Sequence, residues 1–318
     1  MKIELQKWKA VDVRALAEMT SDVRRQEGLG DYTVDQLEEY LNLMNERFPA
    51  EVVVVALQDG TVRGWMGLER TTEEIGEVGR WHPFVSQNPQ REDIAKQLIS
   101  QVNRYALENG IRRIEVGFGE ISESNREAFS QRQSWYKEAG WNKLEEDLFM
   151  GVTPMDKHVM QVPKLESEYD ELPLGDVDEE KLYECYHQAF MTGEAVWIYE
   201  MTEEQRRQEF DKNFDKSRPI NREASFALVK EGEVAGFILV LSRSEEEEYI
   251  ESLGVHPSHR GKGLAKFLLS RVIEVLREKR ENNLTLGVDS VNKPAIDLYE
   301  QVGFQIISRT VRYSWKDS

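Results

Sequence analysis

Apolar and polar residues along the chain follow two periods, and the change from one period to the other predicts where helices and strands lie. Apolar residues that recur every three or four positions predict helices, whereas alternation and short apolar runs predict strands. In the first half this pattern predicts a strand at Ile3–Gln6, helices at Val11–Gln26 and Thr33–Arg47, strands at Val52–Leu57, Val62–Glu69 and Glu77–Val85, a helix at Ile94–Glu108, a strand at Arg113–Phe118, a helix at Ser124–Glu138 and a strand after Gly140-Trp141. The Asp59-Gly60 pair predicts a tight hairpin turn, because these residues readily supply positive φ angles.

The second half of the chain predicts the same order of elements. Its elements are helices at Glu179–Met191 and Thr202–Asp215, strands at Ser225–Lys230, Val234–Leu241 and Tyr249–Val255, a helix at Leu264–Arg280, a strand at Leu284–Asp289, a helix at Lys293–Val302 and a strand after Phe304. Residues 94–102 align with 264–272 at an offset of 170, and residues 135–141 align with 298–304 at an offset of 163. Two anchored blocks in the same order indicate an internal duplication.

The duplication predicts two domains. We expect a first domain at 1–151, a linker at 152–168 and a second domain at 169–318. Pro154 and Pro163 fall in the linker, where they interrupt regular structure.

Composition limits the kinds of protein that this chain can be. The 318 residues include 41 Lys and Arg against 59 Asp and Glu, a net charge of -18, which repels nucleic acid and attracts cationic small molecules. Cys185 is the single cysteine and the five histidines are scattered, so a disulfide scaffold and a metal site are both disfavoured. The apolar runs are too short to span a membrane and the first ten residues lack an apolar signal region, so we expect a cytoplasmic protein.

A glycine-rich turn in the second half carries the candidate chemistry. Residues 251–265 contain a strand, then the turn with Gly261 and Gly263, then the start of a helix. Such a turn can bind a pyrophosphate, because glycines allow close approach and the first amides of a helix are unpaired. It is neither a Walker loop nor a dinucleotide motif. Taken alone, two glycines are equally consistent with a turn that only caps the helix.

Two motifs in this region resemble a known family. Arg260-Gly-Lys-Gly-Leu-Ala265 is similar to the Arg/Gln-x-x-Gly-x-Gly/Ala signature of the GNAT superfamily of N-acetyltransferases. Asn292-Lys-Pro-Ala-Ile-Asp-Leu-Tyr-Glu-Gln-Val-Gly-Phe304 resembles the family's second motif at the expected distance. The two motifs cover about 255–304, the order of elements extends the resemblance to 169–318, and the repeat extends it to 1–151.

The resemblance implies an α/β (α+β) fold with two tandem GNAT-like domains, each a mostly antiparallel twisted sheet with a splayed strand pair and flanking helices. Tyr249–Val255 and Leu284–Asp289 would be the splayed pair, and acetyl-CoA would lie in the wedge between them. Its pantetheine would pair with the backbone near Leu253 and Val255. The remaining residues that the resemblance assigns to acetyl-CoA are Arg260, Gly261, Lys262, Gly263, Leu264, Ala265 and Asn292. For Arg260 and Lys262 the alternative is a solvated basic turn.

The first copy departs from the motif. Gln90, Asp93 and Ala95 align with Arg260, Gly263 and Ala265, so a carboxylate stands where the glycine should approach phosphate. We therefore expect the first domain to be a degenerate, non-catalytic copy. Tyr136 aligns with Tyr299, but without the glycine turn we interpret Tyr136 as a core or groove residue.

The resemblance also implies catalytic roles. Tyr299 would protonate the leaving thiolate, since a phenol stays protonated at neutral pH; the alternative is a packed tyrosine. Glu251 is our candidate base because strand alternation puts it on the same face as Leu253 and Val255, although a solvated edge residue is an equal alternative. Trp197 and Tyr199 would help to bind the acceptor, or simply pack.

These features predict an N-acetyltransferase that moves acetyl from acetyl-CoA to a primary amine by direct attack, with no metal. The acceptor would be a small molecule or a protein amine, with no nucleic acid or membrane partner, and the protein a monomer or homodimer. An alternative is a non-catalytic acyl-CoA-binding regulatory protein, and a third is a structural pseudoenzyme. The identity of the amine and the acyl chain length stay open.

Overall fold

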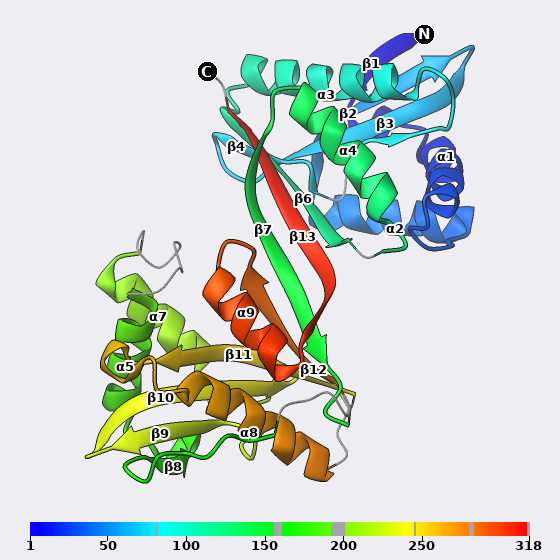
Figure 1. Ribbon diagram of the computed structural model, residues 1–318. Helices are drawn as coiled ribbons and strands as arrows, with labels where there is room; N and C mark the ends of the chain where they lie inside the picture. The colour runs from blue at the N-terminus through cyan, green and yellow to red at the C-terminus, as the bar shows by residue number, and fades with distance from the viewer. Residues whose placement is uncertain are drawn as a thin grey trace. The chain divides into compact units, whose positions relative to one another are not determined.

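The computed structural model describes residues 1–79, 82–121, 123–155, 161–191, 201–244, 246–279 and 283–316. Within these residues the chain forms two compact units (Figure 1). The first unit consists of Met1–Glu146 with Ser308–Ser318, and the second of Asp147–Ile307.

The first unit is an α/β unit whose sheet has the strand order β1-β2-β3-β4-β6-β13. Its elements are β1 (Lys2–Gln6), α1 (Val13–Gln26), α2 (Val34–Arg47), β2 (Ala50–Gln58), β3 (Thr61–Arg70), β4 (Ile75–Glu77), β5 (Phe84–Val85), α3 (Arg91–Glu108), β6 (Arg113–Ile121), α4 (Arg126–Glu138) and the end of β13 (Gln305–Lys316). One apolar cluster lies between the sheet and α3 with α4, and another lies between the sheet and α1 with α2. Both faces of the sheet are therefore covered.

One predicted strand of the first unit is divided in two. The sequence predicted a continuous strand at Glu77–Val85, but β4 pairs with both β3 and β6, whereas β5 pairs with β3. Gly79 has a φ of +42°, and Pro83 has no N–H to donate to a neighbouring strand. These two residues explain why the pairing is interrupted.

The second unit has the strand order β7-β12-β11-β10-β9-β8. Its elements are the end of β7 (Asn142–Val152), β8 (Asp170–Pro173), α5 (Glu179–Met191), α7 (Glu203–Asn213), β9 (Phe226–Lys230), β10 (Glu233–Ser242), β11 (Glu247–Val255), α8 (Leu264–Lys279), β12 (Asn283–Asp289), α9 (Lys293–Val302) and the start of β13. The predicted helices and strands of this half are confirmed to within two or three residues. β8 is a short edge strand that the sequence did not predict.

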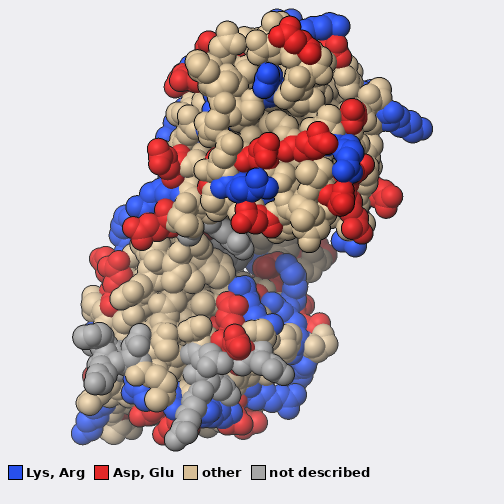
Figure 2. Space-filling view, turned by 90° about the vertical axis from the view of Figure 1, so that its right-hand side faces the viewer, with Lys and Arg blue, Asp and Glu red and all other residues tan. Residues whose placement is uncertain are grey.

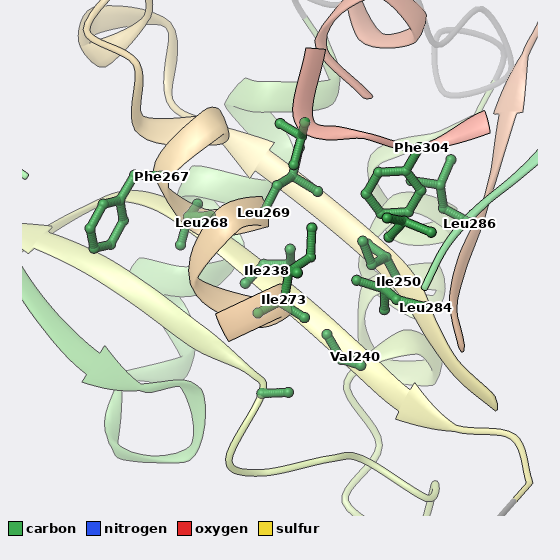
Figure 3. Close-up of a cluster of buried hydrophobic side chains, with 14 of the residues drawn as sticks. Ile238, Val240, Ile250, Phe267, Leu268, Leu269, Ile273, Leu284, Leu286 and Phe304 are labelled. Carbon is green, nitrogen blue, oxygen red and sulfur yellow. The ribbon is translucent and has the colours of Figure 1, made fainter. Parts of the chain in front are cut away.

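The core of the second unit explains why α8 is so apolar. Phe267, Leu268, Leu269 and Ile273 of α8 belong to one apolar cluster with strand side chains such as Ile238 (Figure 3). A second cluster covers the opposite face of the sheet, where α5 and α7 pack. The sheet is thus held between two layers of helices, with α8 and α9 on one side.

The two units share local details beyond the order of their elements. The hairpin turns Asp59-Gly60 and Glu231-Gly232 both have positive φ angles at both residues. Thr33 and Thr202 each cap a helix, and each forms a capping box with a glutamine three residues later. The same turn and the same cap at corresponding places support the duplication inferred from the sequence.

The compact units depart from the expected domain boundaries at both ends. Asp147–Val152 of β7 pair with β12, whereas residues 309–316 of β13 pair with β6. The last strand of each sequence repeat therefore divides at about its middle between the two units. Side-chain alternation tells where such a strand lies in the sequence, but it does not tell which sheet supplies the partner.

The surface carries charges of both signs. Acidic and basic side chains are interspersed over the face seen in Figure 2. Among the described residues, no helix has the length and apolar character needed to span a membrane.

Candidate functional site

A wedge opens between two strands in the middle of the second sheet. β11 and β12 pair in parallel from Glu247 opposite Asn283 to Ile250 opposite Leu286. Past Ile250 the described residues of β11 make no further pairs with β12. On its other side β11 stays paired with β10 up to Val255. The edge of residues 251–255 therefore faces the wedge, where an extended ligand could add to it like a strand.

A β-bulge at Glu251 marks the apex of the wedge. Ser252 pairs with Leu239 and Ile250 pairs with Val240, so Glu251 is the extra residue. The bulge changes the alternation, because Ile250 and Leu253 both contact the cluster beneath α8. Glu251 and Leu253 therefore do not share a face, contrary to the expected alternation.

The Glu251 carboxylate has a partner from another element. Arg218, which follows α7 in the chain, donates from Nη1 to Glu251 Oε1 at 2.8 Å. Both side chains keep some exposure, 28% for Arg218 and 18% for Glu251. The pair is thus held in place but can still be reached from solvent.

The glycine-rich turn lies beside the wedge and leads into α8. Gly261 and Gly263 have φ angles of +78° and +77°, and a Cβ at either position would meet nothing within 4 Å. Phe267 N donates to Gly263 O at 2.9 Å, which is the first hydrogen bond of the helix. The amides of Leu264 and Ala265 precede that bond, so the helix gives them no acceptor. Residues 260–265, which we call the cradle, thus have the open space and the free donors that a pyrophosphate needs.

The two basic residues of the cradle have different surroundings. Arg260 donates to Ala189 O at 2.7 Å and to Val255 O at 3.3 Å, so it ties the cradle to α5 and to the end of β11. Lys262 donates to the Tyr169 hydroxyl at 3.0 Å, and this hydrogen bond raises the pKa of the Lys262 ammonium. Lys262 therefore stays charged beside the cradle, whereas Arg260 also has a structural role.

Tyr299 lies on α9, partly buried against the cluster beneath α8. Its ring centroid is 5.9 Å from that of Phe304. Burial raises the pKa of Tyr299 to about 12, and the nearby Tyr249 adds to this shift. The phenol is therefore a neutral hydroxyl over the whole physiological pH range.

Asn292 was expected to contact acetyl-CoA, and Trp197 and Tyr199 were expected to contact the acceptor. Asn292 caps α9, because its Oδ1 accepts a hydrogen bond from Ala295 N at 3.2 Å. This structural role accounts for the asparagine without any ligand. Trp197 and Tyr199, the expected acceptor residues, lie outside the described residues.

Comparison with known proteins decides the family. The sequence matches the acetyltransferase (GNAT) family over residues 16–141 and again over 181–304. The chain belongs to the GNAT family of acetyltransferases. The two matched regions fall in the two halves of the chain, so this is a tandem GNAT protein.

Curated relatives match shorter stretches of this GNAT chain. Streptothricin acetyltransferase from Streptomyces lavendulae is 38% identical over 79 residues, which is 24% of this chain and 42% of the relative. The L-amino acid N-acyltransferase MnaT from Escherichia coli is 36% identical over 58 residues, 18% of this chain and 34% of the relative. The chain thus spans less than half the length of these relatives.

A solved structure shares the fold over nearly the whole chain. A GCN5-related N-acetyltransferase from Sphaerobacter thermophilus superimposes with a TM-score of 0.58 and 18% identity. The match covers 99% of this chain and 95% of that one. At this identity the likeness supports the fold and nothing beyond it.

One residue beside the wedge, Tyr249, was not singled out from the sequence. Tyr249 lies two residues before the bulge, and its hydroxyl approaches Gly287 on the opposite side of the wedge. Burial raises the pKa of Tyr249, and the nearby Glu251 carboxylate raises it further. Tyr249 in turn raises the pKa of Tyr299. An aromatic residue in the strand before Glu251 was the available signal.

The corresponding region of the first unit is filled by its own side chains. By the offsets of the repeat, Arg91 takes the place of Gly261, and Arg132 takes the place of Ala295. Arg132 Nε donates to Pro83 O at 3.3 Å, and Pro83 aligns with Leu253, where pantetheine was expected to pair in the second unit. A buried guanidinium thus occupies that position in the first unit.

A buried carboxylate holds these two guanidinium groups. Glu27, at the end of α1, forms ion pairs with both Arg91 and Arg132. The three side chains are 9% exposed or less, and Arg91 also lies over the ring of Trp135 at 5.2 Å. We call Glu27, Arg91 and Arg132 the buried triad. It joins the end of α1 to α3 and α4.

No group of three or more His, Cys, Asp and Glu side chains among the described residues is arranged to hold a metal ion.

Proposed function

We propose that the second unit transfers an acetyl group from acetyl-CoA to a primary amine, and that the first unit is non-catalytic. The observation that carries the proposal is the wedge with its free strand edge beside the cradle. The relative MnaT is named an L-amino acid N-acyltransferase, which supports an amino nitrogen as acceptor. The buried triad and Asp93 support the assignment of the first unit.

The residues present fit such a reaction. Acetyl-CoA supplies a thioester whose carbonyl carbon the neutral amine attacks. Glu251, directly or through a water molecule, would accept the proton of the ammonium group. Tyr299 would donate its proton to the departing sulfur, a role that suits a phenol whose pKa is raised by burial. The amides of the cradle would hold the pyrophosphate.

A screen of amines with acetyl-CoA, scored by release of free thiol, tests the proposal. We expect release with at least one class of primary amine. If acetyl-CoA binds but no amine causes release, the protein is a binding or regulatory protein and the proposed activity is wrong.

We expect Tyr299→Phe to lower kcat at least tenfold and to leave the KM for acetyl-CoA within a few-fold. Ten-fold in rate corresponds to about 1.4 kcal/mol, a modest contribution for one positioned proton donor. Because the pKa is raised to about 12, the phenol stays protonated and the defect should be constant from pH 7 to pH 10. Steady-state kinetics across this range is the measurement.

Tyr136→Phe is the matched control for this prediction. Tyr136 occupies the aligned position in the first unit and is fully buried, so its replacement should leave kcat unchanged. Equal losses in the two variants would mean that a phenol on this helix contributes packing rather than a proton.

We expect the defect of Glu251→Gln to shrink as the pH rises from about 7 to about 9. Without the base, attack depends on the free-amine fraction, which grows about tenfold per pH unit below the pKa of the amine. The ratio of the wild-type and variant rates, measured at several pH values, checks this. A constant ratio would assign Glu251 to binding or folding instead.

A further inference from the structure

A cavity lies on the face of the second unit that α5 and α7 cover. It has a volume of about 580 Å³ and opens between α5, α7 and the segment 214–225. Leu182, Phe210 and Phe214 form part of its apolar wall. A cavity of this size accommodates a small molecule with an apolar side chain.

Three basic and two acidic residues line the cavity, although the chain as a whole is acidic. Lys216, Arg218 and Arg222 line it, and among the described residues neither Lys216 nor Arg222 has an ion-pair partner. The acidic lining residues are Asp176 and Glu179. Arg207 already binds Glu179 at 3.1 Å. The cavity therefore favours a ligand that carries a negative charge, which net composition alone did not indicate.

Arg218 connects this cavity to the apex of the wedge. Arg218 lines the cavity, and its guanidinium donates to the carboxylate of Glu251, the candidate base. Its Nη1 also donates to Asn213 O at 3.2 Å, which fixes the guanidinium at the end of α7. A molecule in the cavity can thus contact Arg218, whose ion-pair partner is Glu251.

We propose that the cavity binds the acceptor and that the acceptor is a zwitterion of the α-amino acid class. The ammonium group of the acceptor would replace the Arg218 guanidinium next to Glu251. The carboxylate of the acceptor would bind Arg218 in place of Glu251. Each member of the ion pair would therefore keep a partner of the same charge as before. The apolar wall around Phe210 would receive the side chain. This inference rests on the proposed acetyl transfer, and it makes Arg218 a specificity-determining residue.

The test compares matched acceptors. L-leucine, L-methionine and L-phenylalanine are each assayed with acetyl-CoA beside the amine that lacks the carboxylate: isoamylamine, 3-(methylthio)propylamine and phenethylamine. We expect kcat/KM to be at least tenfold higher for an amino acid than for its matched amine. Arg218→Gln should bring this ratio close to one, mainly by raising the KM of the amino acid, and Arg218→Lys should restore part of it. Arg271→Gln is the control. Arg271 lies on α8 and pairs with Glu171 at 3.1 Å, so its replacement should leave the ratio unchanged.

The outcomes separate this inference from the proposed function. If no amine of any kind causes thiol release, acetyl transfer itself is wrong. If amines are acetylated but those without a carboxylate react as well or better, the zwitterion inference is wrong and acetyl transfer stands. If Arg218→Gln lowers the rates with both members of a pair equally, Arg218 acts only by positioning Glu251, which also overturns the inference.

Discussion

Gly263→Asp is expected to weaken acetyl-CoA binding more than a hundredfold. Gly263 has a φ of +77° and leaves open space where a Cβ would project, directly before the first amides of α8. An aspartate there would fill the space and put a carboxylate beside the pyrophosphate. A hundredfold loss is about 2.7 kcal/mol, to which steric filling of the space and charge repulsion would both contribute. Calorimetric titration with acetyl-CoA is the measurement.

Gly60→Asp provides a control with the same local chemistry. Gly60 also has a φ of +77° with nothing within 4 Å of a Cβ, but it lies in the hairpin turn of the first unit. This variant adds the same backbone strain and the same charge, so binding should not change. Equal losses in both variants would assign the effect to general destabilisation or charge, not to the cradle.

The same titration of the wild-type protein should give one site per chain. Asp93→Gly alone should not add a second site, because the buried triad still fills the first unit. Two equivalent sites in the wild-type protein would contradict the assignment of the first unit as non-binding.

Glu27→Gln is expected to lower the free energy of unfolding of the first unit by about 3–5 kcal/mol, because removing one member of a buried ionic group leaves uncompensated charges. Burial lowers the pKa of Arg91 to about 10 and that of Arg132 to about 9, a sign of how costly the two buried cations are. A urea titration followed by tryptophan fluorescence measures the loss, since Trp65 and Trp135 are buried in this unit.

Glu74→Gln is the matched control for the triad. Glu74 pairs with Arg112 in the same unit at 3.6 Å, but both side chains are largely exposed. Exposed ion pairs contribute about 1 kcal/mol or less, so this variant should unfold nearly like the wild type. Similar losses of unfolding free energy in the two variants would show that burial of the triad gives it no larger contribution to stability than an exposed ion pair has.

The buried triad gives a physical account of how the two repeats diverged. In the second unit, glycines and Ala295 leave room beside the wedge, whereas the first unit has arginines at the aligned positions. Each arginine needs a counter-charge when buried, and Glu27 supplies it for both. In the first unit the aligned positions are thus held by the unit's own buried side chains.

The sequence predicted features that depend on local backbone preference and periodicity. These include most helices and strands, the Asp59-Gly60 hairpin turn and the duplication. Each is decided by a short stretch of residues, so a single sequence is sufficient. The resemblance to the GNAT family was confirmed for the same reason, since both of its motifs are contiguous.

Only the tertiary structure decided features that depend on which distant residues meet. The bulge at Glu251 depends on the register with β10, and that register reverses the face inferred from alternation. The pairing of Arg218 with Glu251 and the approach of Tyr249 to Gly287 depend on loops and strands that lie far apart in the sequence. The division of β7 and β13 between the two units also depends on pairing between residues far apart in the sequence. Periodicity specifies how a strand alternates, but pairing energy between strands is non-local, and it is this energy that determines the partner, the register and the final site.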